Sequence, residues 1–275
     1  MNTYETPTPP RLRLRIPAGR IEIATWDQPV TEVLVEPASP GDSAAAEAAA
    51  GVRQDVRETG DGQEIVVEST GRRGLLGIRR DPELRTTIRA PHGSRLDAES
   101  ASADVTVVGR LAEARIETAS GDVSVGDVGG PASLKTVSGD IEAGAVAGEA
   151  RSATVSGDVE LRSVEGEATL TSVSGDLRVG WAGSSLRAKT VSGDVLLDAV
   201  TRGEVKLQSV SGDITVGVAA GARLWMDVAS LSGETRSDLE PLGGHEGDRE
   251  VELRISANST SGDVRLFRAA GVAPA

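Results

Sequence analysis

The sequence has no cysteine and very few aromatic residues. Its 275 residues include no Cys, one Phe, one Tyr and three Trp. The absence of Cys excludes disulfides, thiolate chemistry and Cys-based metal sites. The shortage of aromatic side chains is typical of a thin interior filled by Val, Ala and Leu. It also argues against the aromatic platforms that carbohydrate-cleaving β-helices usually offer.

Long apolar runs and an excess of basic residues are also missing. The first ten residues, MNTYETPTPP, lack the apolar core of a signal peptide, and no run of 18 apolar residues could span a membrane. These features predict no transmembrane segment and a cytoplasmic location. The formal net charge of −13 disfavours a nucleic-acid partner, because such proteins are usually basic.

What the chain does contain is a regular repeat. Ser-Gly-Asp stands at 120–122, 138–140, 156–158, 174–176 and 192–194, each 18 residues after the last. This period divides into two nonapeptides, and eleven copies follow one another without a gap from Ser100 to Asp198. Position six is apolar in every copy, position eight in ten and position two in ten, while position four is Gly in eight. A fixed period of this kind indicates a repeat architecture.

The nonapeptide predicts one short strand and one bend. Positions six and eight lie on the same face of a strand because side chains alternate with period two, so position seven faces outward. Gly at position four is expected to supply the positive φ that a tight bend needs. Identical bends every 18 residues stack naturally only in parallel, which disfavours a meander of antiparallel hairpins. We therefore predict an all-β fold, a parallel β-solenoid (β-helix) of about 18-residue, two-sided coils.

The regions around the regular repeats predict four segments. Residues 1–10 are expected to be a disordered tail, 11–97 an irregular N-terminal β segment or cap, 98–268 the solenoid with an atypical C-terminal cap, and 269–275 a second tail. Within the cap, Ser39 or Asp42 precedes a short Ala-rich helix, and Val52–Glu58 and Glu64–Ser69 form a hairpin. Towards the C-terminus the period slips, and the bulky Trp225 and Met226 are suited to closing the end.

A basic, apolar loop departs from the repeat pattern. The segment 71–80, GRRGLLGIRR, contains Arg72, Arg73, Leu75, Leu76, Ile78, Arg79 and Arg80. It is either a solvated loop or a contact loop for a protein partner or an anionic membrane surface.

Catalytic and metal sites are not predicted. The Ser residues repeat along the solenoid, whereas the two His residues, His92 and His245, are single and lie outside the regular coils. We expect no catalytic residue, no cofactor and no enzyme activity.

The acidic residues of the bends form a ladder of Asp104, Asp122, Asp140, Asp158, Asp176, Asp194 and Asp213. Asp and Ser accept backbone N–H bonds in turns, which favours a structural role. The alternative is a calcium-binding β-roll, but each bend offers one acid and the Gly-Gly-x-Gly-x-Asp pattern is absent. We therefore predict no metal.

The bends also carry a family resemblance. The TVSGDV-type bends, the segment Ile88–Leu96 and the early Trp26-Asp27 resemble a bacterial adhesin-like β-strand-repeat family of unknown function, over roughly residues 11–267. The resemblance implies a β-helical fold and, from some relatives, a link to envelope-stress systems.

These observations favour a non-catalytic scaffold or protein-interaction module with an unknown protein partner. One alternative is a solenoid that assembles end to end, and another is a carbohydrate-binding or carbohydrate-active β-helix. Because the sequence is irregular at both ends, we expect a monomer or small oligomer.

Overall fold

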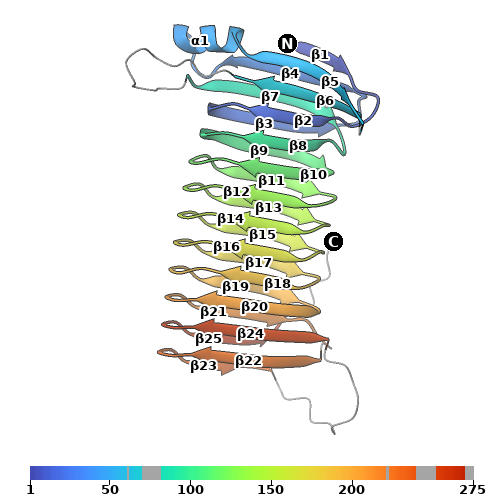
Figure 1. The fold of residues 1–275 in the computed structure, drawn as a ribbon. Helices are drawn as coiled ribbons and strands as arrows, with labels where there is room; N and C mark the ends of the chain where they lie inside the picture. Colours follow the sequence, from blue (N-terminus) through green and yellow to red (C-terminus); the bar gives the residue numbers. More distant parts are fainter. Residues whose placement is uncertain (61, 70–81, 221–222, 240–251, 270–275) are drawn as a thin grey trace. The chain divides into compact units, whose positions relative to one another are not determined.

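The computed structural model describes residues 1–60, 62–69, 82–220, 223–239 and 252–269 (Figure 1). The chain forms two compact units, residues 1–142 (unit 1) and 143–275 (unit 2), and each is described in turn. Strand β13 (Ile141–Val146) contains the boundary between them. The boundary that the sequence places between residues 97 and 98 stays a prediction.

Unit 1 consists of two sheets and one helix. Its strands are β1 (Asn2–Glu5), β2 (Arg11–Arg15), β3 (Ala18–Trp26), β4 (Val30–Pro37), β5 (Arg53–Thr59), β6 (Gly62–Glu68), β7 (Leu84–Pro91), β8 (Arg95–Glu99), β9 (Ser102–Leu111), β10 (Glu113–Glu117), β11 (Val123–Val128) and β12 (Ala132–Lys135), and its helix is α1 (Ser43–Ala50). The strand order is β1-β4-β7-β3-β9-β11 in one sheet and β5-β6-β2-β8-β10-β12 in the other.

The repeat period sets the register of the regular strands in unit 1. Val123 of β11 lies beside Val105 of β9, 18 residues earlier, and the pairing is parallel. Residues at positions six and eight, such as Val123 and Val125, are buried between the sheets. These pairings confirm the predicted parallel β-solenoid and its inward face.

The N-terminal end of unit 1 is antiparallel instead. Strand β4 pairs antiparallel with β7 and with β1, and β5 pairs antiparallel with β6. The predicted hairpin and the predicted Ala-rich helix are both present, with the Asp42 carboxylate accepting the N–H groups of Ala44 and Ala45 at 2.9 and 3.0 Å.

The disordered tail expected at residues 1–10 is not found. Residues 2–5 form β1, and Thr6 is buried with its hydroxyl 3.0 Å from that of Thr31. The sequence Asn-Thr-Tyr-Glu has no apolar alternation because β1 is an exposed edge strand. Its order comes from pairing with β4, which lies 25 or more residues away in the sequence.

Unit 2 repeats the two-sided coil. Its strands are β14 (Ala150–Ala153), β15 (Val159–Val164), β16 (Ala168–Thr171), β17 (Leu177–Ala182), β18 (Leu186–Lys189), β19 (Val195–Val200), β20 (Gly203–Ser209), β21 (Ile214–Val218), β22 (Leu224–Ser230), β23 (Thr235–Ser237), β24 (Leu253–Ser259) and β25 (Val264–Arg268). One sheet has the order β15-β17-β19-β21-β25-β23, and the other has β14-β16-β18-β20-β24-β22.

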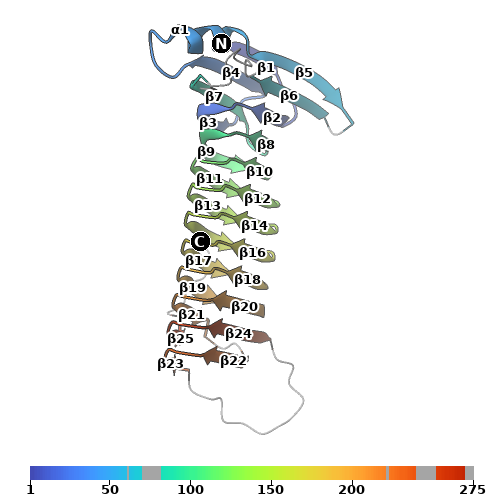
Figure 2. The same ribbon diagram turned by 60° about the vertical axis from the view of Figure 1, so that its left-hand side comes forward.

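The last two coils of unit 2 are stacked out of sequence order. Strand β24 pairs with both β20 and β22, and β25 pairs with both β21 and β23 (Figure 2). The C-terminal coil therefore lies inside the stack, and the preceding coil, β22–β23, lies at the end of the described strands. Trp225 and Met226, expected to close the end, are 43% and 41% exposed on β22. Trp225 instead packs under the guanidinium of Arg254, 4.9 Å from its ring centroid.

The glycines of the Ser-Gly-Asp bends have a role different from the predicted one. Positive φ angles occur at Gly19, Gly41, Gly62, Gly93, Gly109 and Gly203 in the described residues, and at no Ser-Gly-Asp glycine. A Cβ on Gly193 would overlap the carbonyl oxygen of Gly175 in the preceding coil. The prediction of positive φ was wrong, and close contact between stacked bends is what requires Gly.

Replacing such a glycine should disturb the stacking. We expect Gly193→Ala to lower the free energy of unfolding by about 1–3 kcal/mol, the usual cost of overpacking, because the obstructing atom belongs to the backbone. Gly60→Ala is the matched control, since nothing lies within 4 Å of a Cβ at that position. Urea melts followed by circular dichroism measure both variants. Equal midpoints for the two would contradict the proposed close contact.

Candidate functional site

The bends that precede β15, β17, β19 and β21 form one continuous edge of unit 2. We call residues 154–158, 172–176, 190–194 and 209–213 the bend edge. Their backbones are hydrogen-bonded directly to one another: the N–H of Ser174 donates to the carbonyl of Val155 at 2.8 Å, and that of Ser192 to Val173 at 2.9 Å. Equivalent side chains are therefore stacked in straight rows, one per coil.

The first row consists of buried hydroxyl groups. Ser172, Thr190 and Ser209 donate to the carbonyls of Gly157, Gly175 and Gly193 in the preceding coil, at 3.4, 3.2 and 3.1 Å. Each hydroxyl satisfies a bend carbonyl that stacking removes from water. This row fixes the bend from the inside.

The second row is the predicted acidic ladder. The Asp158 Oδ1 atom accepts the N–H of Asp176 at 2.8 Å, and the same bond joins Asp176 to Asp194 and Asp194 to Asp213, each at 2.8 Å. Within unit 1, Asp104 and Asp122 accept the N–H groups of Asp122 and Asp140 at 3.2 and 3.0 Å. The structure thus places all seven predicted residues in ladders, but each donor belongs to the next coil rather than to the same bend. Unit 2 extends the ladder with Asp263 and Glu234, which the sequence analysis did not include.

The ladder geometry bears on metal binding. In the described part of the chain, no group of three or more His, Cys, Asp or Glu residues is arranged to hold a metal ion. In unit 2, Oδ1 of Asp176 and Oδ1 of Asp194 each accept a backbone N–H group from the next coil. That the ladder binds no specific calcium stays a prediction.

The third row consists of exposed valines, which the sequence analysis did not single out. Val155, Val173, Val191 and Val210 are 44%, 46%, 40% and 47% exposed. Val146, Val164 and Ala182 occupy the same nonapeptide position in the opposite bend and are fully or almost fully buried. The sequence shows an apolar residue at position two in both bends. The accompanying Ser-Gly-Asp is the sequence signal that distinguishes the exposed bend from the opposite one.

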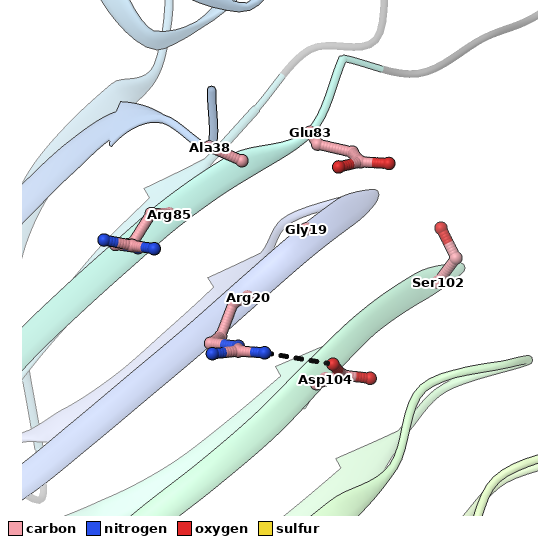
Figure 3. Close-up of a pocket in the computed structure, with 7 residues that line it drawn as sticks. All are labelled: Gly19, Arg20, Ala38, Glu83, Arg85, Ser102 and Asp104. Atoms are coloured by element: carbon pink, nitrogen blue, oxygen red, sulfur yellow. Dashed lines mark ion pairs between the residues drawn. The ribbon is translucent and has the colours of Figure 1, made fainter. Parts of the chain in front are cut away.

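A pocket of about 320 Å³ lies in unit 1 (Figure 3). It is lined by Gly19, Arg20, Ala38, Glu83, Arg85, Ser102 and Asp104. A guanidinium nitrogen of Arg20 lies 3.9 Å from an Asp104 carboxylate oxygen and another lies 3.8 Å from Glu22. These side chains are about half exposed, so the ion pairs contribute little to stability. Mixed charges of this kind suit a surface contact with a polar group.

A second, smaller hollow lies on the outer face of unit 2. Its lining includes Arg187, Glu204 and Lys206. Lys206 Nζ lies 2.8 Å from a Glu204 carboxylate oxygen, and this hydrogen bond holds the pKa of Glu204 below its ordinary value. Because both side chains are about half exposed, the pair is a surface feature.

His92 lies in a hydroxyl–imidazole–carboxylate cluster that the sequence did not reveal. Its Nδ1 atom is 2.6 Å from the Thr25 hydroxyl, and its Nε2 atom is 3.5 Å from an Asp27 carboxylate oxygen. The Thr25 oxygen also accepts the N–H of Arg110 at 2.9 Å, and neither pocket above contains these residues. The Asp27 side chain is 95% exposed. The cluster fastens the turns that follow β3 and β7, whose residues are far apart in the sequence.

The other predicted contact feature cannot be placed. The basic loop of residues 71–80 lies outside the described residues. Among the helices that the structure describes, none is long and apolar enough to cross a membrane.

The ladder predicts that the stability of the fold depends more on the hydrogen-bond acceptor of Asp176 than on its charge. Asp176→Ala removes the acceptor and should lower the free energy of unfolding by about 1 kcal/mol. Asp176→Asn keeps an acceptor oxygen and should change it by less than about 0.5 kcal/mol. Urea melts with and without calcium measure both variants, and calcium should shift neither midpoint. A calcium-dependent stabilisation that Asp176→Asn abolishes would show a specific metal site instead.

Comparison with known proteins places these features in a family. The chain is similar to the crystal structure of an adhesin-like protein from Bacteroides fragilis, with 12% identity, 97% and 95% of the two chains covered and a TM-score of 0.47. It is also similar to one from Parabacteroides distasonis, with 11% identity, 96% and 95% covered and a TM-score of 0.44. A comparison with curated protein sequences finds no match. The sequence profile of the Toastrack DUF4097 family matches residues 43–267, which include both units' repeats. The chain therefore belongs to the Toastrack DUF4097 family.

Proposed function

We propose that this protein is a non-catalytic β-solenoid scaffold that presents its bend edge to a protein partner. The row of exposed valines carries this proposal. Large apolar side chains are exposed at eleven described positions, and six of these, Val137, Val155, Val173, Val191, Val210 and Leu231, occupy the same place in the bend. Apolar exposure concentrated in one repeated position is typical of an interaction surface.

The remaining observations support a binding role over catalysis. The hydroxyl row donates hydrogen bonds to bend carbonyls, and the acidic ladder accepts hydrogen bonds from backbone N–H groups. Both rows therefore stabilise the stacking of the coils. The Thr25 oxygen of the His92 cluster already accepts a backbone N–H. We therefore assign no catalytic role to these residues.

The family resemblance of the bends supports a further proposal, that the partner belongs to a bacterial envelope-stress or surface system. The cytoplasmic location stays a prediction.

A photo-crosslinking amino acid placed on the bend edge tests the proposed function in the native organism. We expect a crosslinker at Val191 to give a discrete protein adduct, because this side chain is 40% exposed within the valine row. A crosslinker at Glu167, exposed on the opposite edge of unit 2, is the control and should give none. Adducts of equal yield at both positions, or none at either, would refute the bend edge as a partner surface.

End-to-end assembly remains a second candidate because of one observation. In the strand order of the described residues, β22 and β23 stand last in their sheets, and edge strands can pair with another chain. The irregular sequence at both ends led us to expect a monomer or small oligomer. Light scattering and electron microscopy of the full chain should therefore show no filaments at micromolar concentration, and filaments would favour the second candidate.

A further inference from the structure

We propose that the bend edge of unit 2 binds a basic amphipathic α-helix of the partner, laid along the row of valines. This inference rests on the proposed function, since it names the kind of partner for the same surface. It draws on the spacing of the valines, the acidic row beside them, and the hydrogen bonds that the backbone carbonyls of the bends already accept.

The valines form a straight apolar row that the fold itself does not require. Each lies four residues before the first residue of its strand, and those first residues are paired in register from Val159 to Ile214. At the same place in the coil that follows Val210 stands Thr260, so a polar β-branched residue is accommodated there. Four successive exposed valines therefore point to a partner.

An acidic row runs beside the valines on one flank. Asp158, Asp176, Asp194 and Asp213 are exposed and follow the valines by three residues. Hydrogen bonds from the backbone hold these carboxylates in line. On the other flank, the residues before the hydroxyl row are the uncharged Thr171 and Gln208 and the basic Lys189. The surface is thus apolar along its centre and negative along one side, which suits a partner with an apolar stripe and a basic flank.

The spacing of the rows fits a helix better than a strand. Stacked coils repeat about every 4.8 Å, whereas side chains on one face of a strand repeat about every 6.8 Å. An α-helix has a pitch of about 5.4 Å, so a helix inclined by about 27° to the row would place one apolar side chain against each valine. The four valines span about 14 Å, which corresponds to roughly three helical turns.

The backbone of the bends also favours a helix. The carbonyls of Val155, Val173 and Val191 accept N–H groups from the next coil, and the carbonyl of Val210 does the same for Ser261. These carbonyls are therefore already bonded, and a partner strand would find few backbone groups to pair with at this edge. A helix satisfies its own backbone internally and needs only side-chain contacts.

A second copy of the chain fits the edge poorly. The chain has a net charge of −13, and its own edge would offer only Lys189 among these flanking residues to an opposing acidic row. An anionic membrane surface is disfavoured for the same electrostatic reason.

The experiment uses the full chain and a synthetic helical peptide of about five turns, with Leu on one face and Lys on the flanks. Fluorescence anisotropy at physiological ionic strength should show saturable binding, and circular dichroism should show the peptide becoming helical. A scrambled peptide of the same composition has no apolar face and should bind more weakly. The four-site variant Val155→Thr, Val173→Thr, Val191→Thr and Val210→Thr keeps every charge and should weaken binding roughly tenfold or more.

Matched controls separate the edge from diffuse charge attraction. Asp176→Asn with Asp194→Asn should weaken binding more than Glu165→Gln with Glu167→Gln, which removes the same charge from the opposite bend. Equal binding of the two peptides, or unchanged binding by the four-site variant, would overturn the inference in favour of diffuse attraction.

Self-association in sedimentation that the four-site variant abolishes, without peptide binding, would overturn it in favour of a second copy. Binding to lipid vesicles that depends on the four valines would likewise overturn it. An adduct at position 191 in cells without helical-peptide binding would leave the proposed function standing and refute only the helix.

Discussion

The structure depends on hydrogen bonds between successive coils, made at the bends as well as along the strands. At residues 172–176, 190–194 and 209–213 of the bend edge, a Ser N–H donates to the Val carbonyl of the preceding coil, and an Asp N–H donates to the Asp carboxylate of that coil. These contacts bring the bends so close that only Gly fits between them. The same contacts hold every residue of the 18-residue repeat directly beside its equivalent, so that each position becomes a row. The buried apolar rows, the hydroxyl row and the acidic ladder all follow from this constraint.

The rows have two different consequences for function. The inward rows at positions six and eight provide the stability of a fold whose single coils cannot bury their own apolar faces. The outward rows present the same chemical group again and again at a constant spacing, which is a surface suited to an elongated ligand. The valine row is the apolar part of this surface, and the acidic row beside it supplies negative charge along one flank. We therefore assign recognition to the bend edge rather than to the pocket of unit 1, where Arg20 already pairs with Asp104.

The equivalence of the bends also explains the unexpected order of the last coils. Asp263 donates its N–H to Asp213, and Glu234 donates to Asp263, so the chain skips a place in the stack and later fills it. Any coil with a Ser-Gly-acid bend can form these bonds with any other. The repeat motif therefore specifies how two coils pair but contains no information about which coil comes next.

Local patterns in the sequence were sufficient to predict the parallel β-solenoid, its 18-residue register, the inward positions six and eight, the short Ala-rich helix and the acidic ladder. Each of these depends on neighbouring residues or on a constant spacing. Tertiary structure decided what depends on contacts between distant segments. It ordered β1 through pairing with β4, brought Thr25, Asp27 and His92 together, and inserted β24 and β25 into the stack. It also buried position two in one bend and exposed it in the other, although nearly every nonapeptide carries an apolar residue at that position. The exposed valines, and with them the proposed binding edge, became visible only through that difference.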